Sequence, residues 1–202
     1  MFITFEGGDG AGKTTQVRML VEWLSAGGKQ VVQTLEPGGT PLGQALRELV
    51  LFGEDMNPRA EALLYAADRS HHVDTVIRPA LDAGKVVVCD RYIDSSVAYQ
   101  GMGRGLGERW VEELNLWAVE GLRPDVTFLL DLDPLVTHQR ISRQMDRLER
   151  AGHDFHVRTR EAFLARAQAE PDRFVVIDAQ ASPEQVHAVV RQDVAPRLGL
   201  NP

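Results

Sequence analysis

The sequence is poor in cysteine and has no long apolar run. Cys89 is the only cysteine among 202 residues, so an intrachain disulfide is excluded and a cytoplasmic protein is expected. It follows three valines, which favours a buried strand residue over a nucleophile. No apolar stretch approaches the ~20 residues of a membrane span, and the chain enters a strand at once, so we expect neither a membrane protein nor a signal peptide.

Lysine is also scarce, since Lys13, Lys29 and Lys85 are the only lysines among 22 basic residues. The net charge of −7 argues against general nucleic-acid binding, which requires a basic face that neutralises phosphates. The many arginines suit bidentate binding of phosphate oxygens, although biased composition explains most of them equally well.

A glycine-rich segment near the N-terminus carries the strongest motif. It fits the pattern G-x-x-x-x-G-K-[ST] and consists of Gly7, Gly8, Asp9, Gly10, Ala11, Gly12, Lys13, Thr14 and Thr15. A strand-like stretch precedes it and a helical pattern follows, so backbone N–H groups and a helix N-terminus would surround a phosphate. This is the phosphate-binding loop of proteins that use ATP or GTP, in which the lysine can reach the outer phosphates and the hydroxyl of the first threonine can ligate Mg²⁺.

Five mostly apolar segments read as strands covered on both faces, and helical patterns separate them. These strands are predicted at residues 2–6, 30–35, 86–90, 126–131 and 174–177. Such alternation predicts a parallel sheet with right-handed crossovers. We therefore expect one α/β domain over residues 1–202, a three-layer P-loop fold with a five-stranded parallel sheet.

Polar residues follow the predicted strands, at the sheet edge where ligands of such folds bind. Asp90 ends the third strand and would help Thr14 to hold Mg²⁺, while Arg91 would clamp phosphoryl oxygens. Capping of the next helix is the alternative role for Asp90. Glu36 and Pro37 begin a turn after the second strand that either faces a substrate or is only a turn.

Two further segments carry weaker signals. Tyr65 and Arg69 lie four residues apart on one helical face, which suits stacking on a base or, equally, a core aromatic beside a surface ion pair. Ser96, Tyr99 and Gln100 lie within about one helical turn of each other. Their pattern alone is weak support for a binding role.

The stretch from Gln144 to Val157 lacks strong apolar periodicity. Six arginines lie in or near it: Arg140, Arg143, Arg147, Arg150, Arg158 and Arg160. We predict a mobile lid at about residues 143–157 that closes over ATP and steadies the transferred charge. The alternative is an exposed helix–turn–helix with Arg–Glu pairs.

Taken in order, the motifs resemble those of the thymidylate kinase family, in its bacterial type, over nearly the whole chain. The matching stretches are FEGGDGAGKTT, EPGGT, YAADR, DRY, SSVAYQGMGRG, DRLE and VIDA. The resemblance implies ATP-dependent phosphorylation of dTMP to dTDP in dTTP biosynthesis, with Mg²⁺ as cofactor, ATP and dTMP as partners and a homodimer as the assembly. Another P-loop nucleotide kinase, with a different acceptor base, is the alternative.

The resemblance also implies roles for single residues. Asp9 would bind the 3′-hydroxyl of the deoxyribose, Tyr65 would stack on thymine, and Tyr99 would line the sugar. Further substrate contacts would come from Pro37, Arg47, Arg69, Arg91, Ser96 and Gln100. Arg140 and Ala179 would cradle the adenine of ATP.

One position sorts the chain within the family. Some members carry an arginine after the acid of the phosphate loop, but Gly10 stands there in this sequence. The catalytic positive charge would then come from the lid, where Arg147, with Arg143 or Arg150, fits. The expected catalytic set is Lys13, Arg91, Arg147 and Asp9.

Overall fold

The computed structural model describes residues 1–136 and 146–201. Its sheet has five parallel strands in the order β2-β3-β1-β4-β5. The strands are β1 (Phe2–Gly7), β2 (Val31–Leu35), β3 (Val86–Asp90), β4 (Val126–Asp131) and β5 (Phe174–Asp178). The predicted fold class and all five strands are confirmed, with boundaries that differ by one residue at most.

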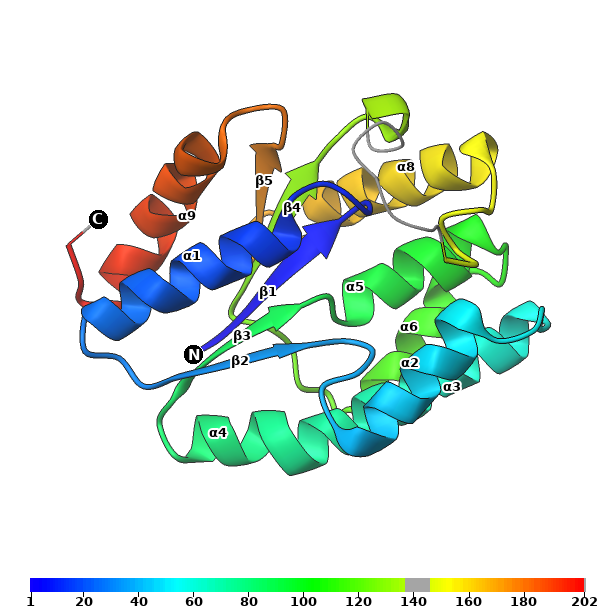
Figure 1. Cartoon of the computed structure of the whole chain (residues 1–202), viewed down its shortest axis with the longest axis horizontal. Coiled ribbons are helices and arrows are strands. Elements are labelled where there is room, and N and C mark those ends of the chain that lie inside the picture. Colours follow the sequence, from blue (N-terminus) through cyan, green and yellow to red (C-terminus); the bar gives the residue numbers. More distant parts are fainter. Residues whose placement is uncertain (137–145, 202) are drawn as a thin grey trace.

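Helices cover both faces of this sheet (Figure 1). The longer ones are α1 (Lys13–Ala26), α2 (Pro41–Phe52), α3 (Pro58–His72), α6 (Glu108–Ala118), α8 (His153–Ala169) and α9 (Pro183–Leu198). Shorter pieces are α4 (Arg78–Asp82) and α5 (Ile93–Ser96), with π-helical turns η1 (Val73–Ile77) and η2 (Val97–Gly103). Within the described ranges, no helix is long and apolar enough to cross a membrane.

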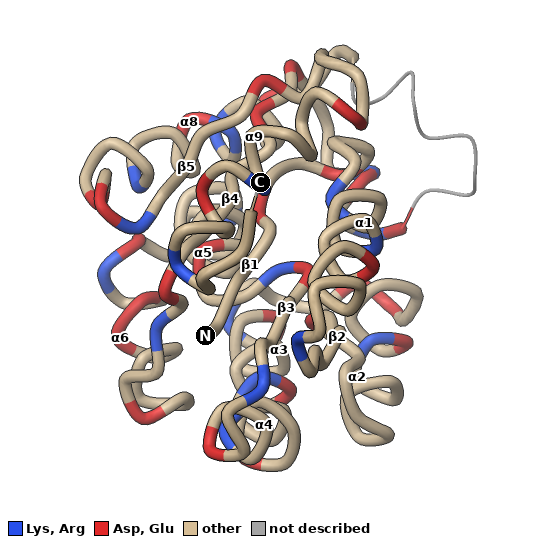
Figure 2. The backbone as a smooth tube through the Cα atoms, turned by 90° about the vertical axis from the view of Figure 1, so that its left-hand side faces the viewer, with Lys and Arg blue, Asp and Glu red and all other residues tan. Residues whose placement is uncertain are grey.

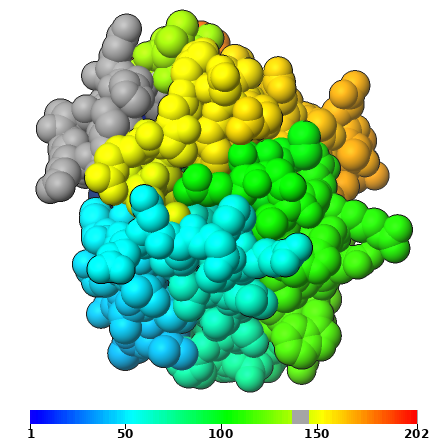
Figure 3. All heavy atoms as spheres, turned by 90° about the vertical axis from the view of Figure 1, so that its right-hand side faces the viewer, coloured from blue at the N-terminus to red at the C-terminus, as the bar shows by residue number. Residues whose placement is uncertain are grey.

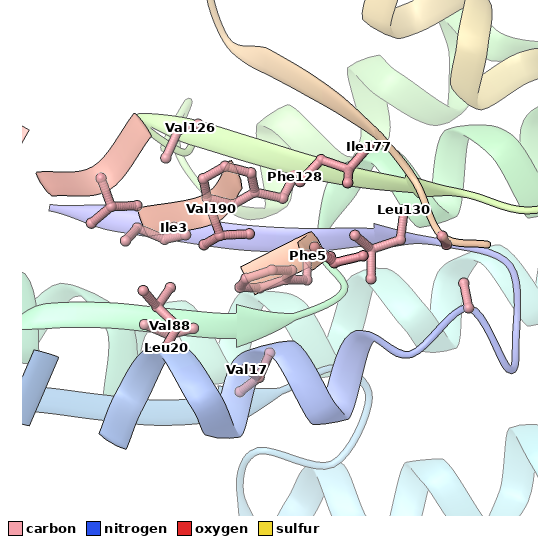
Figure 4. Packing of buried hydrophobic residues seen from close by; sticks show 14 of the residues in the cluster. Ile3, Phe5, Val17, Leu20, Val88, Val126, Phe128, Leu130, Ile177 and Val190 are labelled. Atoms are coloured by element: carbon pink, nitrogen blue, oxygen red, sulfur yellow. The ribbon is translucent and has the colours of Figure 1, made fainter. Parts of the chain in front are cut away.

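The two faces of the sheet bury different clusters because successive strand residues point to opposite sides. One cluster packs strand residues against α1 and α9, and Figure 4 shows Ile3, Phe5 and Phe128 facing Val17 and Val190 there. The opposite face packs against the α4, α6 and α8 side in two further clusters. The central strands are therefore fixed from both sides, which holds their carboxyl ends as a rigid edge.

Local signals explain where several helices begin. Thr40 caps α2 by accepting a hydrogen bond from Gly43 N at 2.9 Å. Ser182 caps α9 in a capping box with Gln185, and a proline follows as the first helical residue. Cys89 is fully buried in β3, as expected.

Acidic and basic positions alternate over the helices and loops rather than separating into two halves (Figure 2). This distribution accompanies the overall net charge of −7.

Candidate active site

The phosphate loop joins β1 to α1 and turns tightly because glycines occupy its left-handed positions. Gly12, immediately before α1, has a φ of 94°. At Gly7 a Cβ atom would lie 2.4 Å from the carbonyl oxygen of Leu130, so only glycine fits against β4. Lys13 Nζ donates to the carbonyl oxygens of Gly7 at 3.1 Å and Gly8 at 2.7 Å. Burial lowers the pKa of Lys13 to about 8.

Two oxygen ligands for a hard cation meet beside this loop. Thr14 Oγ1 donates to Asp90 Oδ2 at 2.8 Å, which brings the start of α1 to the end of β3. Asp90 does not cap the next helix, because α5 has Tyr92 at its N-cap and no side-chain cap bond. A hydroxyl and a carboxylate next to a phosphate loop form a donor set that fits Mg²⁺.

Arg91 connects the loop to the chain that follows β3. Its φ is 71°, an uncommon conformation for a residue with a side chain. The guanidinium donates to Asp9 Oδ1 at 2.5 Å, to the carbonyl of Gly7 at 3.0 Å and to Ser95 Oγ at 2.9 Å. Burial alone would raise the pKa of Asp9, but the positive charge of Arg91 outweighs it and holds that pKa below its usual range.

A fully buried carboxyl group supports this arrangement from behind. Glu6 Oε1 accepts from Tyr92 N at 2.8 Å, and its Oε2 accepts from Ser95 Oγ at 2.5 Å. Burial, with the charge of Asp94, raises the pKa of Glu6 to about 7. Since Ser95 also accepts from Arg91, Glu6 fixes the hydroxyl that orients the arginine. Sequence reasoning missed this residue, although an acid that ends an apolar strand is a detectable signal.

Two cavities adjoin at the carboxyl edge of the sheet. The first, of about 770 Å³, runs along the phosphate loop and includes Lys13, Thr14 and Asp90. The second, of about 550 Å³, is lined by α3, η2 and the turn after β2. Four residues line both cavities: Asp9, Glu36, Arg47 and Arg91. Two ligands that fill these spaces would therefore meet at a pair of acids and a pair of arginines.

The second cavity contains every residue predicted to contact the acceptor. They are Asp9, Glu36, Pro37, Arg47, Tyr65, Arg69, Arg91, Ser96, Tyr99 and Gln100. Sequence reasoning missed Leu51, Ser95, Asp146 and Leu148, which complete the lining. Segments as far apart in the chain as Asp9 and Leu148 thus converge on one space.

Arg69 is the best-anchored side chain of this cavity. It is 1% exposed, and its Nε donates to Glu36 Oε2 at 2.7 Å. Nη1 donates to Ser96 Oγ at 2.9 Å and to Asn115 Oδ1, and Nη2 to the carbonyl oxygen of Tyr92 at 3.0 Å. This set of partners rules out the surface ion pair considered as the alternative for Arg69.

Tyr65 and Tyr99 supply the aromatic walls. Tyr65 belongs to a buried apolar cluster and also lines the cavity, so the core role and the pocket role coincide. Tyr99 Oη donates to Asp9 Oδ2 at 3.1 Å, and its ring packs on Phe155 and Phe163 at centroid distances of 5.9 and 6.1 Å. Each ring is fixed in place before any ligand arrives.

One arginine, Arg47, and two acids, Glu36 and Asp68, hold the turn after β2. Arg47 Nη1 donates to the carbonyl of Pro37 at 2.8 Å, which brings α2 back onto the turn. Glu36 pairs with His72 Nδ1 at 2.8 Å in addition to Arg69. Asp68 Oδ1 accepts from Gly38 N at 3.3 Å, but its second oxygen is buried without a partner, and burial raises its pKa to about 6.

Comparisons with known proteins agree with this geometry. The sequence pattern of the thymidylate kinase family matches residues 5–190. The chain belongs to this family. A thymidylate kinase of Bifidobacterium longum subsp. infantis is 54% identical over 206 residues, covering 100% of this chain and 88% of that protein. One from Leifsonia xyli is 56% identical over 195 residues, covering 95% and 92%.

A solved structure supports the same assignment. The crystal structure of thymidylate kinase from Ehrlichia chaffeensis superposes with a TM-score of 0.80 at 37% identity, covering 96% of this chain and 98% of that one. The chain is therefore a phosphotransferase of the thymidylate kinase family, and the comparisons favour this family over other P-loop nucleotide kinases.

Arg147, the arginine that sequence reasoning placed in the lid, is buried beside α2 and α3. Arg147 is 7% exposed; its Nη1 donates to Glu61 Oε2 at 2.6 Å, and its Nε and Nη2 donate to the carbonyl of Val50. The segment around residue 150 covers the end of α2 and the start of α3 (Figure 3). Arg147 lines neither shared cavity, so its geometry here is that of a buried structural arginine.

The DRLE stretch forms a local turn. Asp146 Oδ1 accepts from Leu148 N and Glu149 N, both at 2.9 Å, and Glu149 Oε2 accepts from Asp146 N at 2.8 Å. Residues 153–157 of the expected lid belong to α8. Lid mobility stays a prediction, and Arg143 lies outside the described residues.

Of the two residues expected to contact adenine, one lies within the described residues. Arg140 lies outside the described residues. Ala179 directly follows β5, and its N–H donates to the carbonyl of Asp131 at 2.9 Å. It packs in one buried cluster with Ala11 of the phosphate loop. Ala179 therefore lies at the same sheet edge as the loop, and its role stays a prediction.

Proposed function

We propose that the chain transfers the terminal phosphoryl group of ATP to dTMP, forming dTDP and ADP, where its two cavities adjoin. ATP occupies the cavity along the phosphate loop, and dTMP occupies the cavity under α3 and η2. The single observation that carries this placement is the set of four residues shared by both cavities. Membership of the thymidylate kinase family supports dTMP as the acceptor.

The chemistry needs no nucleophile from the protein. A phosphate oxygen of dTMP is largely ionised at neutral pH and attacks the terminal phosphorus of ATP, while the bond to the ADP oxygen breaks. A general base would add nothing, because no proton must leave the attacking oxygen. Catalysis then consists of positioning and charge neutralisation. Lys13 and Arg91 supply the fixed positive charge, and Arg47 holds the acceptor phosphate.

Thr14 and Asp90 are the proposed ligands of Mg²⁺. Their 2.8 Å contact brings hydroxyl and carboxylate oxygens to one point beside the loop. Bound Mg²⁺ would neutralise charge on the ATP phosphates during transfer. The chain itself holds Asp90 at the end of β3. There the carboxylate of Asp90 orients the hydroxyl of Thr14 toward the proposed position of the metal.

The acceptor contacts follow from the walls of the second cavity. Tyr65 stacks on the thymine ring, while Arg69, Ser96 and Gln100 face its polar edge. The deoxyribose contacts are proposed separately: Asp9, Pro37 and Tyr99. The bond from Tyr99 to Asp9 orients the carboxylate toward the 3′-hydroxyl.

ATP contacts are proposed for the whole phosphate loop. Its members are Gly7, Gly8, Asp9, Gly10, Ala11, Gly12, Lys13, Thr14 and Thr15. Arg140 and Ala179 are proposed at adenine. A lid arginine completes the family mechanism, and Arg147 would have to leave Glu61 to act as one.

We also propose a homodimer in the cytoplasm. Trp110 and Trp117 lie one heptad apart on α6 and are 42% and 80% exposed. These two side chains are therefore not part of the buried core. Large exposed rings on one helix face suit contact with a second copy. The single buried cysteine, Cys89, supports a reducing compartment.

An acceptor panel tests the proposed reaction. ADP release is measured with ATP, Mg²⁺ and, in turn, dTMP, dUMP, dCMP, dGMP and a thymidine monophosphate without its 3′-hydroxyl. We expect the highest kcat/KM with dTMP and a marked loss without the 3′-hydroxyl. Equal kcat/KM for dCMP and dTMP would reject thymine as the base that this cavity selects.

A further inference from the structure

Gln100 lines the second cavity, which is called the base cavity below because the proposed function places thymine there. An acid outside this cavity holds the side-chain amide of Gln100. The residue belongs to η2, is 2% exposed and lines the cavity. Its Nε2 donates to Glu61 Oε1 at 2.8 Å. Glu61 itself belongs to α3 and does not line that cavity. An acid behind the site thus contacts an amide within it.

The partners of Glu61 fix its hydrogen-bonding character. The residue is 0% exposed, and its Oε2 accepts from Arg104 Nη2 at 3.1 Å and Arg147 Nη1 at 2.6 Å. A carboxylate paired with two guanidinium groups acts only as an acceptor. The amide atom of Gln100 that faces Glu61 is therefore the NH₂ group, and a flipped amide would set oxygen against oxygen.

The carbonyl oxygen of Gln100 is consequently turned the other way. No described residue donates a hydrogen bond to it, and it is not one of the buried polar atoms that lack a partner. It therefore borders open space in the base cavity. Arg69 lines the same space and donates hydrogen bonds to Glu36, Ser96, Asn115 and the carbonyl oxygen of Tyr92, at least four in all. The cavity thus presents a fixed acceptor beside a group that only donates.

These two polarities match one base edge and oppose another. Thymine offers O4 as an acceptor and N3–H as a donor, whereas cytosine offers an N4 donor and an N3 acceptor. Arg69 can donate to O4, and the Gln100 carbonyl can accept from N3–H. With cytosine, the N4 donor would face the donor Arg69 and the N3 acceptor would face the carbonyl oxygen of Gln100. These buried polar groups would then lack partners, which disfavours cytosine strongly.

We propose that Glu61 is a specificity-determining positioning residue, which locks the amide of Gln100 so that its carbonyl reads N3–H of the acceptor base. The proposal rests on the placement of dTMP in the base cavity. Glu61 touches no substrate and acts only through Gln100. Without its carboxylate the amide is free to rotate and present NH₂ to cytosine N3.

The test compares two acceptors on one variant. For Glu61→Gln, kcat/KM is measured with dTMP and with dCMP. We expect the dTMP-to-dCMP ratio to fall at least about tenfold, through a higher KM for dTMP and a lower KM for dCMP. A merely structural role would lower both values together and leave the ratio unchanged. A folded Glu61→Gln protein whose ratio stays within twofold of wild type overturns the proposal.

Arg104→Gln is the matched control, because it removes a guanidinium from Glu61 but leaves the contact with Gln100 intact. Its ratio should stay at the wild-type value, and a tenfold fall there would also overturn the proposal. If Glu61→Gln does not fold, the exchanged pair Glu61→Gln with Gln100→Glu decides. It keeps the local charge and an acceptor facing the base, so a ratio within threefold of wild type supports the proposal and a collapsed ratio rejects it.

Failure of the proposed reaction would look different. The wild-type chain would then show no preference for dTMP over dCMP, and the variants would have nothing to change. A wild-type preference that survives in folded Glu61→Gln instead leaves the proposed function standing and removes only the role of Glu61.

Discussion

The first cavity, proposed for the ATP phosphates, and the second cavity, proposed for the base, are built in opposite ways. They are called the phosphate end and the base end of the site. At the phosphate loop, backbone groups and a few short contacts surround a cavity of about 770 Å³, and Lys13 bonds only to main-chain oxygens among the residues described. At the base cavity of about 550 Å³, buried charged side chains hold one another, with Arg69, Glu36 and Glu61 each 2% exposed or less.

On the placement of ATP and dTMP proposed above, this difference follows from what each end must distinguish. All nucleotides carry similar phosphates, so a cradle of main-chain amides and fixed cations suffices there. Bases differ only in a few donors and acceptors, and a side chain can read those only if its own partners fix its orientation. The base end therefore needs a buried network, which costs free energy wherever a polar atom lacks a partner, as at Asp68 Oδ2.

The largest expected effect breaks the junction between the two ends. Arg91→Ala removes the cation that contacts Asp9 and lines both cavities, so kcat should fall on the order of 10²–10³-fold. The ADP-release assay measures this loss, with thermal unfolding as the check that the fold survives. Arg109→Ala, which removes an exposed arginine paired with Glu113 on α6, is the control. Normal turnover in Arg91→Ala contradicts the clamp role.

A second change acts at the phosphate end alone. Asp90→Asn weakens the proposed Mg²⁺ site, and we expect the half-saturating Mg²⁺ concentration to rise about 10–100-fold. Initial rates across a Mg²⁺ titration give this value. Asp178→Asn changes the acid that ends the edge strand β5 and should leave the titration unchanged. An unaltered curve for Asp90→Asn would remove this carboxylate from the proposed metal site.

A third change tests whether Arg147 has a structural role or acts as the lid arginine. Among the described residues, Arg147→Met leaves Glu61 with Arg104 as its guanidinium partner, so the free energy of unfolding should fall by about 2 kcal/mol. Urea unfolding measures that loss, and Arg150→Met, an exposed neighbour, is the control. If stability is kept while kcat drops with unchanged KM for dTMP, Arg147 acts as the lid arginine and the buried pairing with Glu61 is left during turnover.

The smallest expected effect concerns the unpaired oxygen of Asp68. Its pKa, raised by burial to about 6 from 3.8, means that the native state favours the protonated acid. Wild-type stability should therefore rise as the pH falls from above 6 toward 3.8. Asp68→Asn should be more stable than wild type by about 1 kcal/mol at pH 7.5 and should lose about half of that advantage at pH 5. Urea unfolding at both pH values measures this, and an advantage that does not change with pH would contradict the buried charge.

Features encoded by neighbouring residues could be predicted from the sequence, whereas features that join distant segments could not. The phosphate loop and the five strands depend on contiguous patterns, and the structure confirms the strands. Arg147 was assigned to a lid because its segment lacks apolar periodicity. Its partner Glu61 lies 86 residues away, a distance at which no local pattern applies.

Support residues follow the same rule. Glu6 is visible as a charge at the end of an apolar strand, but its partners Tyr92 and Ser95 are 86 and 89 residues distant. Only the pairing of β1 with β3 brings them together. A sequence pattern therefore indicates which residues line the cavity more readily than which residues hold those side chains in place.

The buried thiol of β3 makes the molecule convenient for spectroscopy. Cys89 has no exposed surface, and burial raises the pKa of its thiol well above the ordinary value, so little reactive thiolate forms. A single cysteine introduced on the surface would then be the only thiol that a maleimide dye modifies. Two surface cysteines introduced and labelled together could follow distances across the two proposed nucleotide cavities during turnover, without first removing a native cysteine.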